Sequence, residues 1–157
     1  MSVVLKVFGG VVALTATTAL AAPAQAAGFP DEVVRLTNVE RQANGCADFV
    51  VHKSLTAAAQ AHSQDMADHN FMGHNGSNGS SPWDRIIAAG YTKWTGLAEN
   101  VAAGYQTPEA VVKGWMASPG HRANIVNCKL KEIGVGYAVN PNTTYRVYWT
   151  QDFGSRS

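Results

Sequence analysis

Hydrophobic positions in the first half of the chain recur every three or four residues, which is the period of an α-helix. The first such segment begins at Asp31, the expected N-cap, and ends at Asn44 and Gly45. The second runs from about Ser54 to His69, with apolar residues on one face and polar residues on the other. We therefore expect two amphipathic helices, each packing one face on a core.

Two shorter helices are indicated by their capping residues. Ser81 and Asp84 form a capping box at the start of a helix that ends near Ala89. Thr107 opens another helix, which ends near Ala117. Helices are thus predicted to precede the strands at the C-terminal end of the sequence.

The hydrophobic pattern changes to a period of two near the C-terminus, which predicts a β-hairpin. The residues that share one face are Ile133, Val135, Tyr137 and Val139 in one strand and Tyr145, Val147, Trp149, Gln151 and Phe153 in the other. Gly134, Gly136 and Ala138 form a face small enough for a helix to approach closely. The stretch from Leu97 to Tyr105 is also expected to be extended or irregular.

Helices followed by strands predict an α+β domain. There is more helix than one face of a small sheet can hold. We therefore expect a three-layer α-β-α sandwich, with a small antiparallel sheet between helices.

The N-terminal residues 1–26 have the pattern of a secretory signal peptide. Lys6 precedes an apolar stretch from Val7 to Leu20, and Ala24-Gln25-Ala26 forms a cleavage site. A transmembrane anchor is the alternative, but glycines and threonines interrupt the stretch, which falls short of about 20 apolar residues. We expect residues 27–157 to form one secreted, extracellular domain, without a membrane-spanning segment after cleavage.

Composition narrows the classes of partner. The chain has 12 basic and 11 acidic side chains, and only 15% of its residues are charged. A nucleic-acid binder or a polybasic membrane binder would show clustered basic residues. We expect no nucleic-acid partner, and a monomer that binds a small molecule, a lipid or a peptide.

Secretion of the protein would affect how its two cysteines are interpreted, because disulfides form in oxidising compartments. Cys46 and Cys128 are an even pair in an oxidising compartment, so a disulfide between them is expected. In the alternative, one of them is a nucleophile with a histidine as its base. The disulfide accounts for both cysteines at once.

Glu99 is the most informative carboxylate. Two positions away on either side stand Leu97 and Val101, so an extended backbone points its side chain into an apolar row. A buried carboxylate needs a partner. Glu99 is therefore either a structural acid bonded to backbone amides or an arginine, or part of a functional site.

Two histidines are candidates for the same site. His121 follows Ser118, the expected N-cap of a helix, whose positive dipole end favours the neutral imidazole that ligates a metal or accepts a proton. His74 lies in a loop rich in glycine and serine, residues 73–81, and is free to turn into a cleft or into solvent.

The other histidines are weaker candidates for a functional site. His62 and His69 are two helical turns apart, about 10 Å, which is too far for one metal ion. Neither an HExxH nor a CxxC pattern is present. The aromatic residues are interpreted mostly as packing residues, with a lipid or glycan groove as the alternative.

Several segments together closely resemble the bacterial SCP-domain branch of the CAP superfamily, which includes cysteine-rich secretory proteins, venom allergens and plant pathogenesis-related proteins. The segments are Ala58–Ala67, Phe71–His74, Ala98–Ala102, Trp115–Ile125, Glu132–Gly136 and Tyr148–Gly154. The resemblance covers nearly the whole chain after residue 26. It implies an α-β-α sandwich with a large cleft.

The resemblance also implies which residues line the cleft. His74 and His121 match the two family histidines, and Glu99 matches the glutamate of the G-E-N block. Ser118 stands where eukaryotic members have a second glutamate, three residues after Trp115. The family implies divalent metals at the histidines, and lipids or sterols in some members.

Two functions follow as expectations. The first is an extracellular binding module that requires no cofactor, with Zn or another divalent metal at His74 and His121. The second is a hydrolase of peptide or cell-wall substrates, with Glu99 as general base and a water held by the histidines. A triad of Ser118, His121 and Glu99 is a third alternative, without a nucleophile elbow to support it.

Overall fold

The computed structural model describes residues 28–157. The predicted signal peptide, residues 1–26, lies outside this range and stays a prediction. No helix in the described range is long and apolar enough to cross a membrane.

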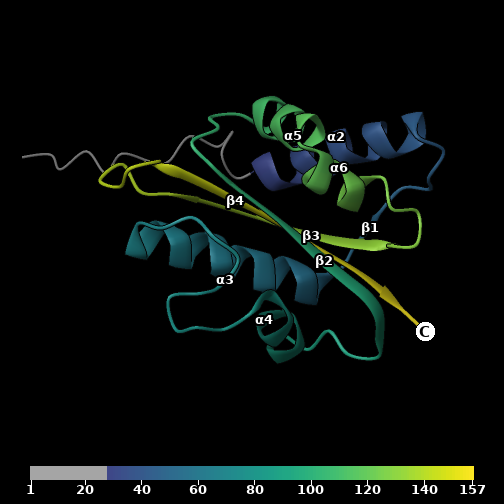
Figure 1. Ribbon diagram of the computed structural model, residues 1–157, viewed down its shortest axis with the longest axis horizontal. Helices are drawn as coiled ribbons and strands as arrows, with labels where there is room; N and C mark the ends of the chain where they lie inside the picture. Colours follow the sequence, from purple (N-terminus) through teal and green to yellow (C-terminus); the bar gives the residue numbers. More distant parts are fainter. Residues whose placement is uncertain (1–27) are drawn as a thin grey trace, which may run out of the picture.

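The described chain folds into three layers, with a four-stranded sheet between two groups of helices (Figure 1). The strands, in the order β1-β3-β4-β2 across the sheet, are Val50–Val51 (β1), Glu132–Val139 (β3), Val147–Arg156 (β4) and Trp94–Ala103 (β2). One face is covered by Phe29–Ala43 (α2), Pro108–Ala117 (α5) and Pro119–Ile125 (α6). The other is covered by Lys53–His69 (α3) and Pro82–Ala88 (α4). This is the predicted α-β-α sandwich.

The three long strands pair antiparallel, as expected for the hairpin of β3 and β4. Two features were not predicted. The two-residue β1 adds a parallel pair to β3, and β2 is a ten-residue strand at the other edge of the sheet, with one register shift between Trp94 and Gly96.

The small face of β3 brings α3 unusually close. A Cβ added at Gly134 would overlap the backbone of Leu55, and one at Gly136 would overlap the backbone of Ala59. The predicted close approach of a helix to this face is therefore confirmed.

Strand β4 separates the two sides of the sheet by alternation. Trp149 and Phe153 pack in the core beneath α2 and α5, and Gln151 donates to the Thr37 hydroxyl on α2 at 2.9 Å. On the opposite face, Thr150 bonds Ser63 of α3 at 2.9 Å. Residues of β4 with even numbers therefore face α3.

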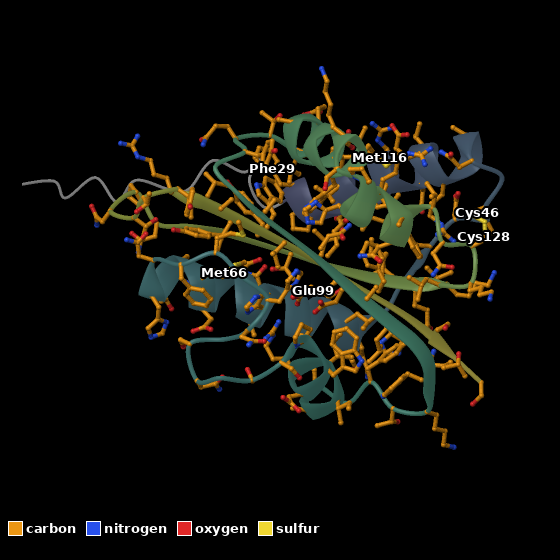
Figure 2. All side chains as sticks on the ribbon, viewed as in Figure 1. Phe29, Cys46, Met66, Glu99, Met116 and Cys128 are labelled. Atoms are coloured by element: carbon orange, nitrogen blue, oxygen red, sulfur yellow. A yellow bond between two sulfur atoms is a disulfide. The ribbon has the colours of Figure 1, made fainter. Side chains whose placement is uncertain are left out.

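Cys46 and Cys128 form the expected disulfide, with their Cα atoms 5.0 Å apart, beyond the end of α2 (Figure 2). The buried Arg41 lies close by in sequence and donates to four backbone carbonyls, those of Ala47, Ile125, Asn127 and Leu130. Both features tie α2 to the chain around residues 125–130. Figure 2 shows the disulfide well apart from Glu99.

The expected capping role of Asp31 is wrong. Helix α2 starts earlier, with Gly28 as its N-cap and no side-chain capping bond. Pro30 is the second helical residue and has a preset backbone, and Asp31 lies in the first turn, where its charge interacts favourably with the helix dipole. The predicted caps at Ser81 and Thr107 are confirmed, including the capping box with Asp84.

Candidate functional site

Glu99 lies at the centre of the site, on the face of β2 that is turned toward α3 and α4 (Figure 2). Its side chain is only 1% exposed. Nδ1–H of His74 donates to Oε1 at 2.8 Å, and the Arg85 guanidinium donates to Oε2 at 2.7 Å. Leu97 and Val101 pack on the same side, as the alternation predicted. Glu99 is thus both a paired structural acid and the support of a site histidine.

Arg85 joins the carboxylate to the neighbouring loop. It extends from α4, and its second guanidinium nitrogen donates to the Ser80 carbonyl at 3.0 Å. The sequence indicated that Glu99 needs a partner such as an arginine, but nothing in the spacing identifies Arg85 as that partner. Its role depends on how α4 docks against β2.

Asp152 is a second buried carboxyl group beside Glu99. The two residues are directly opposite each other in the pairing of β4 with β2, and Asp152 is fully buried. Neither of its oxygens accepts a hydrogen bond from any described residue, whereas a protonated Asp152 can donate to Glu99. Burial and the negative charge of Glu99 raise the pKa of Asp152 well above its ordinary value.

The pKa of Glu99 is shifted in the opposite direction. Burial works against its ionisation, but the hydrogen bond from His74, the neighbouring Asp152 and the charge of Arg85 outweigh that effect. The pKa of Glu99 therefore lies below its ordinary value. The two carboxyl groups therefore share one proton, held by Asp152, in the pH range between the ionisation of Glu99 and that of Asp152.

Side chains of α3 hold the loop that carries His74 in place through hydrogen bonds. The buried His62 bonds the Gly73 carbonyl through Nε2 at 2.7 Å, and burial lowers the pKa of His62 so that its ring is neutral. Asp65 accepts hydrogen bonds from the backbone and hydroxyl of Ser77. His62 is thus a packed residue of the helix, as expected, but one that also positions the backbone next to His74.

His74 itself is half exposed, at 53% of its side chain. The hydrogen bond to Glu99 raises its pKa above the ordinary value, although burial opposes the shift. Nε2 has no hydrogen-bond partner among residues 28–157, so it is the atom available to a ligand.

His121 lies in the first turn of α6, as predicted from the sequence. Burial, and then the charge of His74, lower the pKa of His121, which keeps its ring neutral. Ser118 is the N-cap residue by backbone geometry, but its side chain makes no capping bond. The expected neutral state of His121 therefore has burial as its leading cause.

Two asparagines that the sequence analysis did not single out connect β2 to α6. Asn100 donates to the His121 carbonyl at 3.1 Å, and Asn124 donates to the Asn100 side chain at 2.9 Å. Asn124 also reaches the Glu99 carbonyl at 3.4 Å. These bonds fix the backbone of His121 relative to Glu99. The position of Asn100 directly after Glu99 was the available signal.

Two cavities open beside these residues. One of about 370 Å³ is lined by His74, Pro82, Trp83, Leu97, Ala98, Glu99 and Asn124. The other, of about 280 Å³, is lined by Met72, Val101, Ala102, Ala103, Tyr105, Gly114, Trp115, Ser118 and His121. The structure thus brings His74 and Glu99 into direct contact and places His121 and Ser118 in the neighbouring cavity along β2. A single cleft shared by both histidines stays a prediction.

The donor set decides what kind of metal site these residues fit. In the range 28–157, no three histidine, cysteine or carboxylate residues are grouped so as to hold an ion. Both Glu99 oxygens already accept hydrogen bonds, which leaves Nε2 of His74 and the ring of His121 as donors. Two imidazoles fit an open, exchangeable site and not a closed structural one. Glu99 would orient His74 as carboxylates do behind metal-bound histidines.

The sequence matches a known protein family. The sequence profile of the cysteine-rich secretory protein family (CAP) matches residues 34–153. YkwD of Bacillus subtilis strain 168 is 40% identical over 136 residues, which are 87% of this chain and 51% of YkwD. YlbC, a membrane protein of the same organism, is 32% identical over 125 residues, 80% of this chain and 34% of YlbC. The chain thus spans about half or less of these relatives.

Solved structures show the same fold. An extracellular SCP-domain protein from Bacillus anthracis superposes with a TM-score of 0.75 at 26% identity, over 89% of this chain and 45% of that protein. An outer surface protein of Borrelia burgdorferi gives a TM-score of 0.66 at 21% identity, over 81% of this chain and 89% of that protein.

Proposed function

Because the chain belongs to the cysteine-rich secretory protein (CAP) family, we propose that it is an extracellular binding module whose ligand site is the cleft along β2. The observation that carries this proposal is the contact between His74 and the buried Glu99. It leaves Nε2 of His74 available beside an open cavity. A side chain held in this way is preorganised to receive a ligand.

A divalent metal such as Zn is one ligand that the cleft would accept. His74 and His121 would hold it, with Glu99 fixing the ring of His74. When bound, the ion would supply a positive centre with open positions for an anionic or carbonyl group. Since protonated imidazole cannot ligate, and the pKa of His74 is raised, binding should already fade as pH falls toward the ordinary histidine range.

Calorimetric titration with Zn tests the proposal. The wild type should bind weakly at pH 7.5 and more weakly at pH 5.5, and His74→Ala and His121→Ala should each lower the affinity at least about tenfold. The matched control is His69→Ala, which removes an exposed histidine that bonds Asp65. Unchanged affinity in both site variants would contradict the shared site.

An extracellular hydrolase of peptide or cell-wall substrates is the second candidate. The pairing of Glu99 with Asp152 favours it, because one acid can hold a proton beside a carboxylate base. His74 and Arg85 occupy both Glu99 oxygens, so Glu99 would act on a water through His74. Release of products from wall fragments by the wild type, abolished in Glu99→Gln, would establish this candidate. Equal rates in both proteins would eliminate it.

A further inference from the structure

The two cavities follow each other along one strand. Leu97 and Glu99 line the first cavity, and Val101 and Ala103 line the second. From the first to the last of these residues, an extended strand covers about 20 Å. A ligand that fills both cavities therefore has to be chain-like.

An exposed aromatic ring lies in each cavity. Trp83 is 41% exposed in the first, and Tyr105 is 38% exposed in the second. Trp83 belongs to the capped first turn of α4, and the Tyr105 ring packs directly against Gly114. Aromatic side chains have few rotatable bonds, so they bind flat apolar surfaces at a low cost in entropy.

The lining favours an uncharged ligand. Neither cavity is lined by a lysine, an arginine or an aspartate, and the Glu99 carboxylate is neutralised by His74 and Arg85. An anionic lipid would therefore meet no free cation from the residues that line these cavities. Among the residues that line the two cavities, the side-chain polar atoms without a partner within residues 28–157 are all hydrogen-bonding groups that a hydroxyl can meet. They include Ser118 Oγ, Asn124 Oδ1, Nε2 of His74, the ring nitrogens of His121, the Tyr105 hydroxyl and the Trp83 indole N–H.

The edge of β2 is not available to a peptide strand at this point. The Glu99 carbonyl accepts from Asn124 at 3.4 Å, and the Val101 carbonyl accepts from the Trp115 indole at 3.2 Å. Addition of a peptide to a sheet edge requires such carbonyls to be free. A ligand that uses hydroxyl groups has no such requirement.

We infer that the two cavities form one trough that binds a neutral glycan chain, with sugar rings stacked on Trp83 and Tyr105. The C–H face of a pyranose is flat and apolar, and its hydroxyls match the amide, hydroxyl and imidazole groups between the two rings. The inference rests on the proposed binding function and names the class of its ligand.

Titration of the protein with N-acetylchitohexaose, followed by tryptophan fluorescence and calorimetry, tests the inference. The wild type should bind the oligosaccharide. Trp83→Ala and Tyr105→Ala should each lower the affinity about fivefold to tenfold, and Tyr105→Phe should retain most of it, because the ring remains. The control is Trp94→Ala, since Trp94 is equally exposed at 40% but lines neither cavity. Circular dichroism checks that each variant is folded.

Failure of this inference is distinguishable from failure of the proposed function. Absence of chitohexaose binding, an equal loss in Trp94→Ala, or binding of an uncharged hexapeptide in its place would overturn the glycan assignment. Zn binding that depends on the histidines would survive those outcomes, and the binding module would stand without the glycan.

Discussion

Asp152 and Glu99 are chemically similar but have opposite roles. Their environments separate them, because Arg85 and His74 contact Glu99, whereas no donor within residues 28–157 contacts Asp152. As pH rises, Glu99 therefore loses its proton before Asp152 does. Between these two ionisations, one negative charge, not two, is buried beside His74.

This arrangement predicts how stability depends on pH. The folded pKa of Asp152 is raised, so its contribution to stability is full below the ordinary pKa of 3.8 and is lost as pH rises toward the folded value. Asp152→Asn removes this loss and keeps a donor for Glu99. The variant should gain stability relative to the wild type with rising pH, by up to about 1.4 kcal/mol per unit. Urea unfolding between pH 4 and pH 8 measures the difference, and parallel profiles would contradict the shared proton.

At the scale of elements, the site depends on how one loop is fastened. The segment between α3 and α4 is bonded to α3 through His62 and Asp65, and to α4 through Arg85. His74 is part of this segment. Its position therefore depends on bonds made by residues that do not touch the ligand.

His62→Phe should weaken Zn binding several-fold, because the Gly73 carbonyl loses its donor and the loop gains freedom. Stability should fall by about 1 to 3 kcal/mol, since that carbonyl is left unsatisfied. His62→Gln, which keeps an N–H donor, should recover part of both losses. Calorimetry and urea unfolding measure the two effects. Full Zn affinity in His62→Phe would show that the loop positions His74 without this bond.

Some features of the helices and strands could be predicted from the sequence, and others could not. Local patterns correctly predicted the caps at Ser81 and Thr107, the small face of β3 and the direction of the Glu99 side chain. The partnership of Glu99 with Arg85 and Asp152 depends on helix docking and strand register. These are set by contacts between segments far apart in the chain, which periodicity does not encode.

At the scale of the whole molecule, the contacts that stabilise the fold and the residues that line the cavities lie in different places. The disulfide and the Arg41 bonds fasten α2 to the chain around residues 125–130, while the two cavities lie along β2. Glu99, which supports His74, is thus held on a strand, and strands hold side chains in place more firmly than loops do.

Replacement of both cysteines by serine should therefore lower stability and leave the site intact. Closing a loop of 82 positions is worth about 4 to 5 kcal/mol in the chain-entropy model. Under conditions where the Cys46→Ser/Cys128→Ser variant remains folded, its Zn affinity should match that of the wild type. A tenfold weaker affinity would mean that the disulfide also shapes the cleft.

The central claim is that His74 and His121 serve one ligand site, with Glu99 supporting His74. Nuclear magnetic resonance of the imidazole groups tests it most directly, by titrating both rings with acid and then with Zn. We predict that His74 titrates above 6.5 and His121 below it, and that both rings respond to Zn together with one stoichiometry. A response of only one ring, or independent responses at two stoichiometries, would contradict the shared site.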